Sequence, residues 1–120
     1  MYNLGIFNRA GIVSFKSGLE GMSSIDNDGQ IHIETVRLDD ILRGKQISFI
    51  KMDIEGSELE ALQGAEEIIR NQKPKLAICV YHKKEDIISI PSLLLKYNSN
   101  YKFKLRHYST SPSETVLYAF

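Results

Sequence analysis

The stretch from Phe49 to Gly64, with the sequence FIKMDIEGSELEALQG, constrains the fold of this chain more than any other segment. It begins inside the apolar run 47–54, which has the β-branched and aromatic residues of an interior strand. Asp53 and Glu55 stand at the end of that strand, and a helical pattern follows the next glycine. Ligands of open α/β sheets bind at the carboxyl ends of strands. The segment therefore predicts a strand, a turn and a helix, with carboxylates where a ligand would bind.

A helix is predicted over residues 57–70. Ser57 and Glu60 have the S-x-x-E spacing of a capping box, in which the two side chains satisfy early backbone donors of a helix. Apolar residues then recur at helical spacing, at Leu59, Leu62, Ala65 and Ile69. Pro74 ends the helical region and residues 75–81 resume as a strand. Strand, helix and strand in this order form a βαβ unit, which implies parallel strands with a right-handed crossover.

The first part of the chain has the pattern of short strands and turns. Asp28-Gly29 is a hairpin-type turn signal. The expected elements are strands at 4–7, 12–16 and 31–38, followed by one helical turn at 39–43 that Gly44 closes.

The last part of the chain is predicted to hold a helix and a hairpin. The helix spans about 84–97 and is expected to break at Pro91, a residue that suits a first helical turn. Residues 101–107 alternate between apolar and basic, as in a strand with one wetted face. Residues 115–120 are apolar on both faces. We therefore expect the final strand to insert between its hairpin partner and the βαβ unit.

Length and composition set the general class of the protein. The 120 residues are expected to form one domain over 1–120, with 42% hydrophobic and 25% charged residues, as in ordinary globular proteins. The net charge is zero, which argues against nucleic acid and anionic membranes as partners. The apolar runs are too short to span a bilayer and no signal peptide is evident, so we expect a cytoplasmic protein. The single cysteine, Cys79, is interpreted as a small buried hydrophobic residue.

Taken in order, several motifs resemble the FkbM family of S-adenosylmethionine-dependent methyltransferases. The resemblance covers residues 35–120 well and the first 34 loosely. It implies an α/β fold with an incomplete Rossmann-like class I methyltransferase sheet, mixed parallel with an antiparallel C-terminal hairpin. The matching segments are Leu38-Asp39-Asp40, the run from Phe49 to Glu58, Leu62-Gln63-Gly64-Ala65, Lys73-Pro74-Lys75, Tyr81-His82, and the run from Tyr101 to His107.

The cofactor-binding half of that family has no counterpart in this chain. In the family, the cofactor site begins with a strand and a glycine-rich turn, where the backbone approaches the cofactor closely. The glycines here stand at positions 5, 11, 18, 21, 29, 44, 56 and 64, and none forms G-x-G after an apolar strand. The chain therefore resembles the C-terminal portion of the family. S-adenosylmethionine is the implied cofactor, and we expect this chain alone to be inactive.

The resemblance implies site residues at the carboxyl ends of the two parallel strands. Asp53 would lie near the methionine part of the cofactor or would orient an acceptor hydroxyl. Glu55, two residues on, would point the same way if the strand persists that far. His82 would lie on the same rim, where a histidine can take the acceptor's proton near neutral pH.

Structural roles for the same residues remain open. Asp53 can cap a turn, Glu55 can be solvated, and His82 can cap the following helix. His32 and His107 are interpreted as strand-face residues, and the spacing of the histidines predicts no metal site.

Two functional classes follow. The first is part of an FkbM-like O-methyltransferase that acts on a hydroxyl of a sugar, glycan or other secondary metabolite. The second is an inactive oligomerising or binding module, since the strand at 47–54 lacks its usual neighbour and an apolar edge invites pairing with a second copy. An unrelated small α/β fold is a further alternative, and it predicts no pairing between the strands at 114–120 and 75–81.

Overall fold

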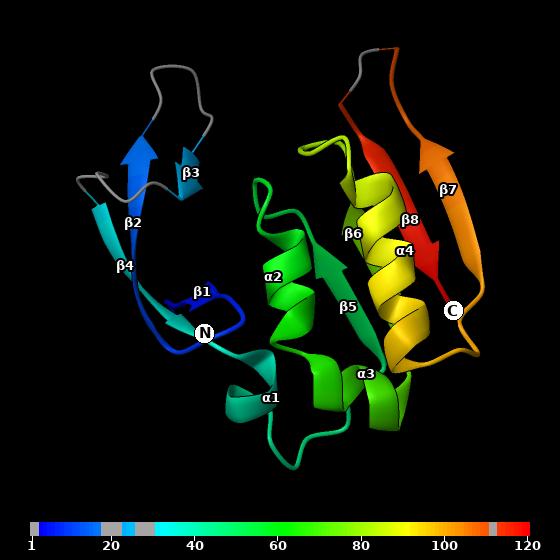
Figure 1. The fold of residues 1–120 in the computed structure, drawn as a ribbon, viewed down its shortest axis with the longest axis horizontal. Coiled ribbons are helices and arrows are strands. Elements are labelled where there is room, and N and C mark those ends of the chain that lie inside the picture. The colour runs from blue at the N-terminus through cyan, green and yellow to red at the C-terminus, as the bar shows by residue number, and fades with distance from the viewer. Residues whose placement is uncertain (1–2, 18–22, 26–30, 111–112) are drawn as a thin grey trace.

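The computed structural model describes residues 3–17, 23–25, 31–110 and 113–120, which form two four-stranded sheets and four helices (Figure 1). The first sheet has the strand order β1-β4-β2-β3. Strand β3 was not predicted, and the turn predicted at Asp28-Gly29 lies outside the described residues. The strands of this sheet are β1 (Gly5–Ile6), β2 (Gly11–Ser17), β3 (Ser23–Ile25) and β4 (Ile31–Val36).

The second sheet contains β5 (Phe49–Met52), β6 (Lys75–Cys79), β7 (Phe103–His107) and β8 (Thr115–Ala119), in the order β5-β6-β8-β7. Strands β5 and β6 are parallel, whereas β8 runs antiparallel to both β6 and β7. The predicted insertion of the final strand is therefore confirmed. The pairing of β8 with β6 contradicts the unrelated fold, which required that these strands stay apart.

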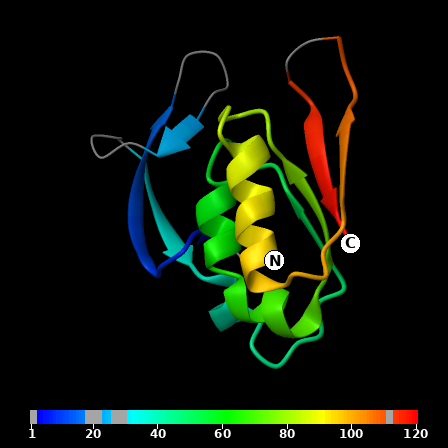
Figure 2. The same cartoon turned by 45° about the vertical axis from the view of Figure 1, so that its right-hand side comes forward.

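Three helices connect the strands of the second sheet: α2 (Glu58–Gln63), α3 (Glu66–Gln72) and α4 (Asp86–Tyr97). Helices α2 and α4 lie over the same face of the sheet (Figure 2). The core forms between them and the sheet, because the apolar stripes of the helices meet the strand β6. Its largest fully buried apolar side chains include Leu62, Ile69, Leu76, Ile78, Ile90 and Leu94.

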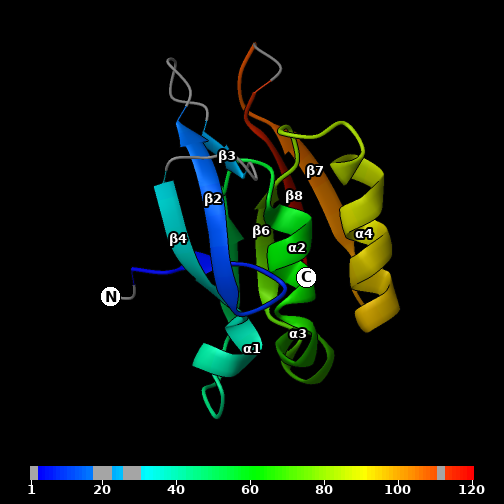
Figure 3. The same ribbon diagram turned by 60° about the vertical axis from the view of Figure 1, so that its left-hand side comes forward.

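The predicted helix at 57–70 is interrupted at Gly64 and Ala65, so the expectation of a single helix was wrong. The carbonyl of Gly64 accepts a hydrogen bond from the N–H of Asp39 at 2.9 Å. The carbonyl of Phe7 packs against the same glycine so closely that any Cβ there would collide with its oxygen. The helix breaks because the loop between β1 and β2 and the start of α1 (Leu38–Ile41) both dock at this point (Figure 3).

The capping-box prediction was also wrong. Ser57 makes no side-chain cap bond, and Glu60 lies 3.7 Å from Lys83 instead of reaching back to the helix start. The neighbouring carboxylate of Glu58 turns inward and accepts a hydrogen bond from the N–H of Ile54 at 2.9 Å. The start of α2 is therefore tied to the end of β5 by a buried glutamate.

Helix α4 runs unbroken through Pro91, contrary to the predicted break. The helix begins at Asp86, so the proline is its sixth residue and not part of the first turn. Proline has no N–H, which leaves the carbonyl of Ile87 without its helical donor. Ile87 is exposed, so water can take that bond.

Asp39 joins the two sheets. Its buried carboxylate accepts the N–H groups of Glu67 and Ile68, both at 3.0 Å, and lies 3.2 Å from Arg37. These backbone groups belong to the first turn of α3, where a carboxylate is favourable. The short helix α1 is thereby fixed against α3. No helix in the described part of the chain is long and apolar enough to cross a membrane.

Candidate functional site

Asp53, Glu55 and His82 lie together at the carboxyl ends of the parallel strands β5 and β6. Nε2 of His82 is 3.7 Å from Oδ1 of Asp53 and 3.6 Å from Oε2 of Glu55. Parallel neighbours end at the same edge of a sheet, which explains why Asp53 and His82, far apart in the sequence, meet here. The structure therefore brings all three predicted site residues into one cluster, called the rim cluster below.

The turn after β5 places Glu55 in this cluster. Glu55 has φ of 55° and Gly56 has φ of 89°, both in the left-handed region. For a glutamate this conformation is costly, on the order of 1–3 kcal/mol, and such strain concentrates at functional sites. A strand continued in regular geometry would not fold Glu55 back towards His82.

Glu58 holds the other side of the His82 ring. Its side chain is fully buried, and Oε1 lies 3.0 Å from Nδ1 of His82. The His82 side chain is itself only 10% exposed. The sequence did not single out Glu58, because the S-x-x-E spacing of a capping box points to Glu60 instead. The one indication in the sequence was that Glu58 is the last residue of the motif from Phe49 to Glu58.

Tyr81 adds a hydrogen-bond donor to the cluster. Its hydroxyl donates to Oδ1 of Asp53 at 3.1 Å, and its ring centroid lies 4.1 Å from that of His82. Burial, the hydrogen bond to Asp53 and the charge of Asp53 together raise the pKa of Tyr81 to about 12. Tyr81 is therefore protonated at neutral pH and fixes one oxygen of Asp53.

The structure also bears on the structural roles considered for the three residues, which were a turn cap, a solvated carboxylate and a helix cap. Asp53 accepts no backbone N–H among the described residues, and the N-terminus of α4 has no side-chain cap, so His82 does not cap it. Glu55 is 47% exposed and so remains partly solvated while it faces the imidazole.

The other two histidines lie elsewhere, on the strands β4 and β7. Nδ1 of His32 is 3.1 Å from Oγ of Ser14, and Nδ1 of His107 is 2.8 Å from Oγ1 of Thr115. Each makes a cross-strand contact.

Cys79 is buried beneath the cluster, in agreement with its interpretation as a small core residue. Burial, followed by the charge and hydrogen bonding of Asp53, raises the pKa of the thiol to about 11. The thiolate that nucleophilic chemistry needs is therefore absent at neutral pH.

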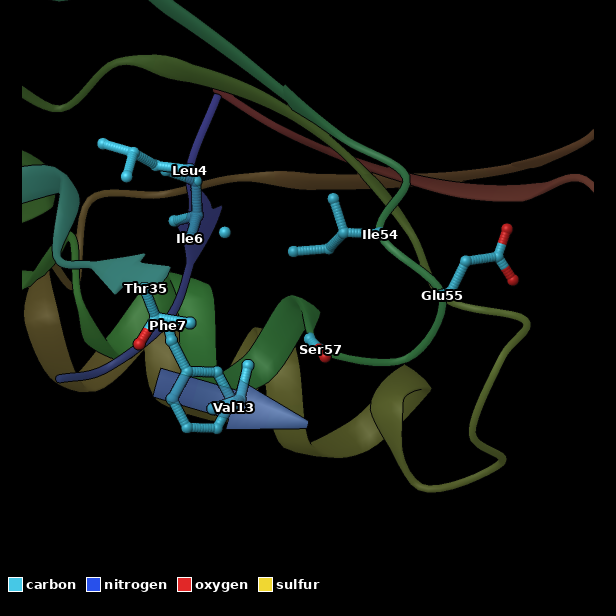
Figure 4. Close-up of a pocket in the computed structure, with 9 residues that line it drawn as sticks. Leu4, Ile6, Phe7, Val13, Thr35, Ile54, Glu55 and Ser57 are labelled. Carbon is cyan, nitrogen blue, oxygen red and sulfur yellow. The ribbon is translucent and has the colours of Figure 1, made fainter. Parts of the chain in front are cut away.

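An apolar cavity of about 260 Å³ lies beside the turn that carries Glu55 (Figure 4). The carboxylate of Glu55 points away from the apolar side chains (Figure 4). The cavity could hold an apolar part of a ligand, while the rim cluster offers acceptors and an imidazole. Its lining comes from both halves of the chain: Leu4, Gly5, Ile6, Phe7, Val13, Thr35, Ile54, Glu55 and Ser57.

Comparisons with known proteins give the family and the fold of this chain. The family described as "Methyltransferase FkbM domain" matches residues 5–105. The crystal structure of methyltransferase FkbM from Methylobacillus flagellatus KT is similar to this chain, with a TM-score of 0.81 and 34% sequence identity. The match covers 99% of this chain and 28% of that one, so the chain spans little more than a quarter of that protein. No curated protein matches this chain.

Proposed function

Because this chain belongs to the FkbM methyltransferase family, we propose that it contributes the acceptor side of an S-adenosylmethionine-dependent O-methyltransferase. The proposed acceptor is a hydroxyl of a sugar, glycan or other secondary metabolite. The observation that carries the proposal is the position of the His82 Nε2 between the carboxylates of Asp53 and Glu55 at the carboxyl ends of β5 and β6. Ligands of open α/β sheets bind at such ends.

The chemistry asked of these residues is modest. The methyl donor is already activated, so catalysis consists mainly of placing the acceptor oxygen in line with the methyl group. The reaction forms a C–O bond, breaks the C–S bond of the sulfonium and releases the hydroxyl proton. Asp53 would accept a hydrogen bond from the hydroxyl and orient it, and His82 would take the proton. Glu58 would keep the imidazole in place.

The described residues do not form a complete cofactor site. A nucleotide cradle needs a glycine-rich turn after a strand. Among the described glycines, those with φ between 60° and 90°, Gly44 and Gly56, stand singly and far apart. Asp53 is the residue we assign to the methionine end of the cofactor. We propose that the nucleotide cradle comes from residues outside this chain, in the same protein or in a second one.

A chimaera tests this function. The 120-residue chain would replace the matching segment of the Methylobacillus flagellatus protein, and S-adenosylhomocysteine release would be measured with a panel of hydroxyl compounds. Asp53→Asn and His82→Gln should each reduce the rate by about 10²-fold or more, the usual contribution of a positioned acid–base group. Asp40→Asn is the control, because its carboxylate has the same 45% exposure as that of Asp53 and lies far from the rim cluster. Equal rates in all three chimaeras would refute the assignment.

A non-catalytic oligomerising module is the second candidate, and the edge of β5 favours it. Within the described part of the chain, β5 pairs with β6 alone, and Phe49 at its start is 56% exposed. An open apolar edge of this kind is a template for pairing with another strand. We propose a homo-oligomer that covers this edge.

A further inference from the structure

We propose that Asp53, Glu55 and His82 form a binding site for one divalent transition-metal ion, of the class that includes Zn²⁺ and Mn²⁺. The catalytic use of this ion rests on the proposed function, since the ion would sit where the acceptor hydroxyl is oriented. Binding of the ion rests on geometry alone.

The distances within the rim cluster suit a shared ion better than hydrogen bonds. Nε2 of His82 is 3.7 Å from Asp53 and 3.6 Å from Glu55, and the candidate ligand atoms all lie within 4.8 Å of one another. Both short distances exceed the usual range of a hydrogen bond. Two ligands bound tetrahedrally to Zn²⁺ at about 2.1 Å lie roughly 3.4 Å apart. The two carboxylates are 45% and 47% exposed, so small rotations can close the remaining gap.

The imidazole is held in the orientation that a metal ligand needs. The His82 side chain is nine-tenths buried, and its Nε2 has no hydrogen-bond partner among the described residues. On the other side of the ring, Nδ1 lies 3.0 Å from the fully buried carboxylate of Glu58, although the angles of this pair are not those of a hydrogen bond. A metal-ligating histidine almost always donates its second N–H to a group of this kind.

In the tautomer with its proton on Nδ1, towards Glu58, the lone pair of Nε2 faces two carboxylates. With a proton on Nδ1, nothing on the imidazole attracts Asp53 or Glu55, and the lone pair is repelled by their oxygens. A cation between the three groups turns each of these contacts into an attraction. The cation of Lys83 does not serve this purpose, because it pairs with Glu60.

The ligand set selects the class of ion. Imidazole nitrogen with carboxylate oxygen suits Zn²⁺ and other transition metals, whereas Mg²⁺ and Ca²⁺ prefer oxygen ligands alone. Three protein ligands leave a coordination position open, as in catalytic rather than structural sites. A hydroxyl bound there would be more acidic, so the ion would take over the activation of the acceptor while His82 acts as a ligand. The hydroxyl proton would then pass to solvent.

The test is titration of Zn²⁺ and Mn²⁺ into the metal-stripped 120-residue chain by calorimetry, without methyl donor or acceptor. Co²⁺ would be titrated in parallel, because its visible spectrum reports nitrogen ligation. We expect one saturable site that Asp53→Asn and Glu55→Gln each weaken by at least about tenfold, as expected for groups that hold or orient a metal. Asp40→Asn and His107→Gln, which alter an exposed carboxylate and an exposed histidine, should leave the affinity unchanged.

Asp53 and Glu55 are both exposed enough that their variants should fold, which circular dichroism would verify. Absence of saturable binding, or binding that neither variant weakens, would overturn the metal site. Such a result would leave the O-methyltransferase proposal intact, because that proposal is tested by the chimaera's rates. Conversely, metal binding with no effect of Asp53→Asn on the chimaera would preserve the site and refute its catalytic use.

Discussion

Oε1 of Glu58 lies 3.0 Å from Nδ1 of His82, and both side chains are buried at the carboxyl ends of two parallel strands. A buried carboxylate is costly unless it is paired and hydrogen-bonded. Oε1 of Glu58 accepts the N–H of Ile54 and faces the imidazole of His82, whereas Oε2 is buried without a hydrogen-bond partner among the described residues. The glutamate therefore serves both the fold, by tying α2 to β5, and the candidate site, by orienting the imidazole.

The first prediction concerns Glu58→Gln. Glutamine can still accept from the N–H of Ile54, but it removes the negative charge beside Nδ1 of His82. Loss of such an outer partner reduces metal affinity by roughly 10–100-fold, and calorimetric titration with Zn²⁺ would measure it. Glu60→Gln is the control, since Glu60 pairs with Lys83 and not with the imidazole. Equal affinities in both variants would show that Glu58 does not orient the ring.

The second prediction concerns Asp39, which caps α3. Asp39→Ala removes an acceptor for two backbone N–H groups in a buried place. We expect the free energy of unfolding to fall by about 1.5–3 kcal/mol, the range for hydrogen bonds to a charged group. Asp40→Ala, which loses an exposed pair with Arg43, should cost less than about 0.5 kcal/mol. Urea unfolding followed by circular dichroism would compare them, and similar losses would contradict the capping role.

The third prediction is a dependence of stability on alkaline pH. The buried hydroxyl of Tyr101 donates to the carbonyl of Pro74 at 2.7 Å, and burial raises the pKa of Tyr101 to about 12. The unfolded chain releases this proton near pH 10, whereas the folded chain keeps it until about 12. The contribution of Tyr101 to the free energy of unfolding should therefore be level below pH 10 and should fall between pH 10 and 12 by about 1.4 kcal/mol per pH unit for one proton.

Tyr101→Phe isolates this contribution. The buried Cys79 and the partly exposed Tyr81, with pKa values raised to about 11 and 12, add to the wild-type slope in the same direction. In the variant, the fall of the unfolding free energy with rising pH should be smaller by the contribution of one proton. At neutral pH the variant should also be about 1 kcal/mol less stable, because the carbonyl of Pro74 loses its donor. Urea unfolding at a series of pH values would measure both effects. An unchanged slope would mean that Tyr101 ionises alike in both states.

The fourth prediction concerns the open edge of β5. If two copies pair along this edge, Phe49→Lys should shift the chain towards monomer, because a charge on an edge strand opposes pairing. Leu105→Lys is the matched control, since Leu105 is similarly exposed, at 52% against 56%, on the opposite edge strand β7. Light scattering at micromolar concentration would measure the mass. A monodisperse wild-type monomer would refute the oligomer.

The second sheet could be predicted from sequence because its determinants are local. The apolar runs at 75–79 and 115–119 and the interposed helical patterns define a βαβ unit followed by an inserted antiparallel strand. The break at Gly64 could not be predicted, because it depends on the carbonyl of Phe7, 57 residues earlier in the chain. The capping role of Asp39 depends in the same way on a distant helix.

In the candidate site, too, some features follow from local sequence and others depend on tertiary structure. Asp53 and His82 could be placed on one rim because parallel strands end at the same edge. The return of Glu55 towards His82 depends on a left-handed backbone at a glutamate, which sequence does not indicate. The inward turn of Glu58 places its carboxylate beside Nδ1 of His82, a residue from a later strand end. Spacing of histidines alone predicted no metal site, since the candidate ligands come from two separate strand ends.

The most direct test of the account is titration of S-adenosylhomocysteine and S-adenosylmethionine into this chain, followed by calorimetry and by amide chemical shifts. The central claim is that the chain carries the acceptor side, with Asp53, Glu55 and His82, but not the nucleotide cradle. The account predicts a dispersed spectrum of a folded protein with no saturable binding of either ligand. Binding at micromolar affinity would contradict it, because the cradle would then be present within these 120 residues.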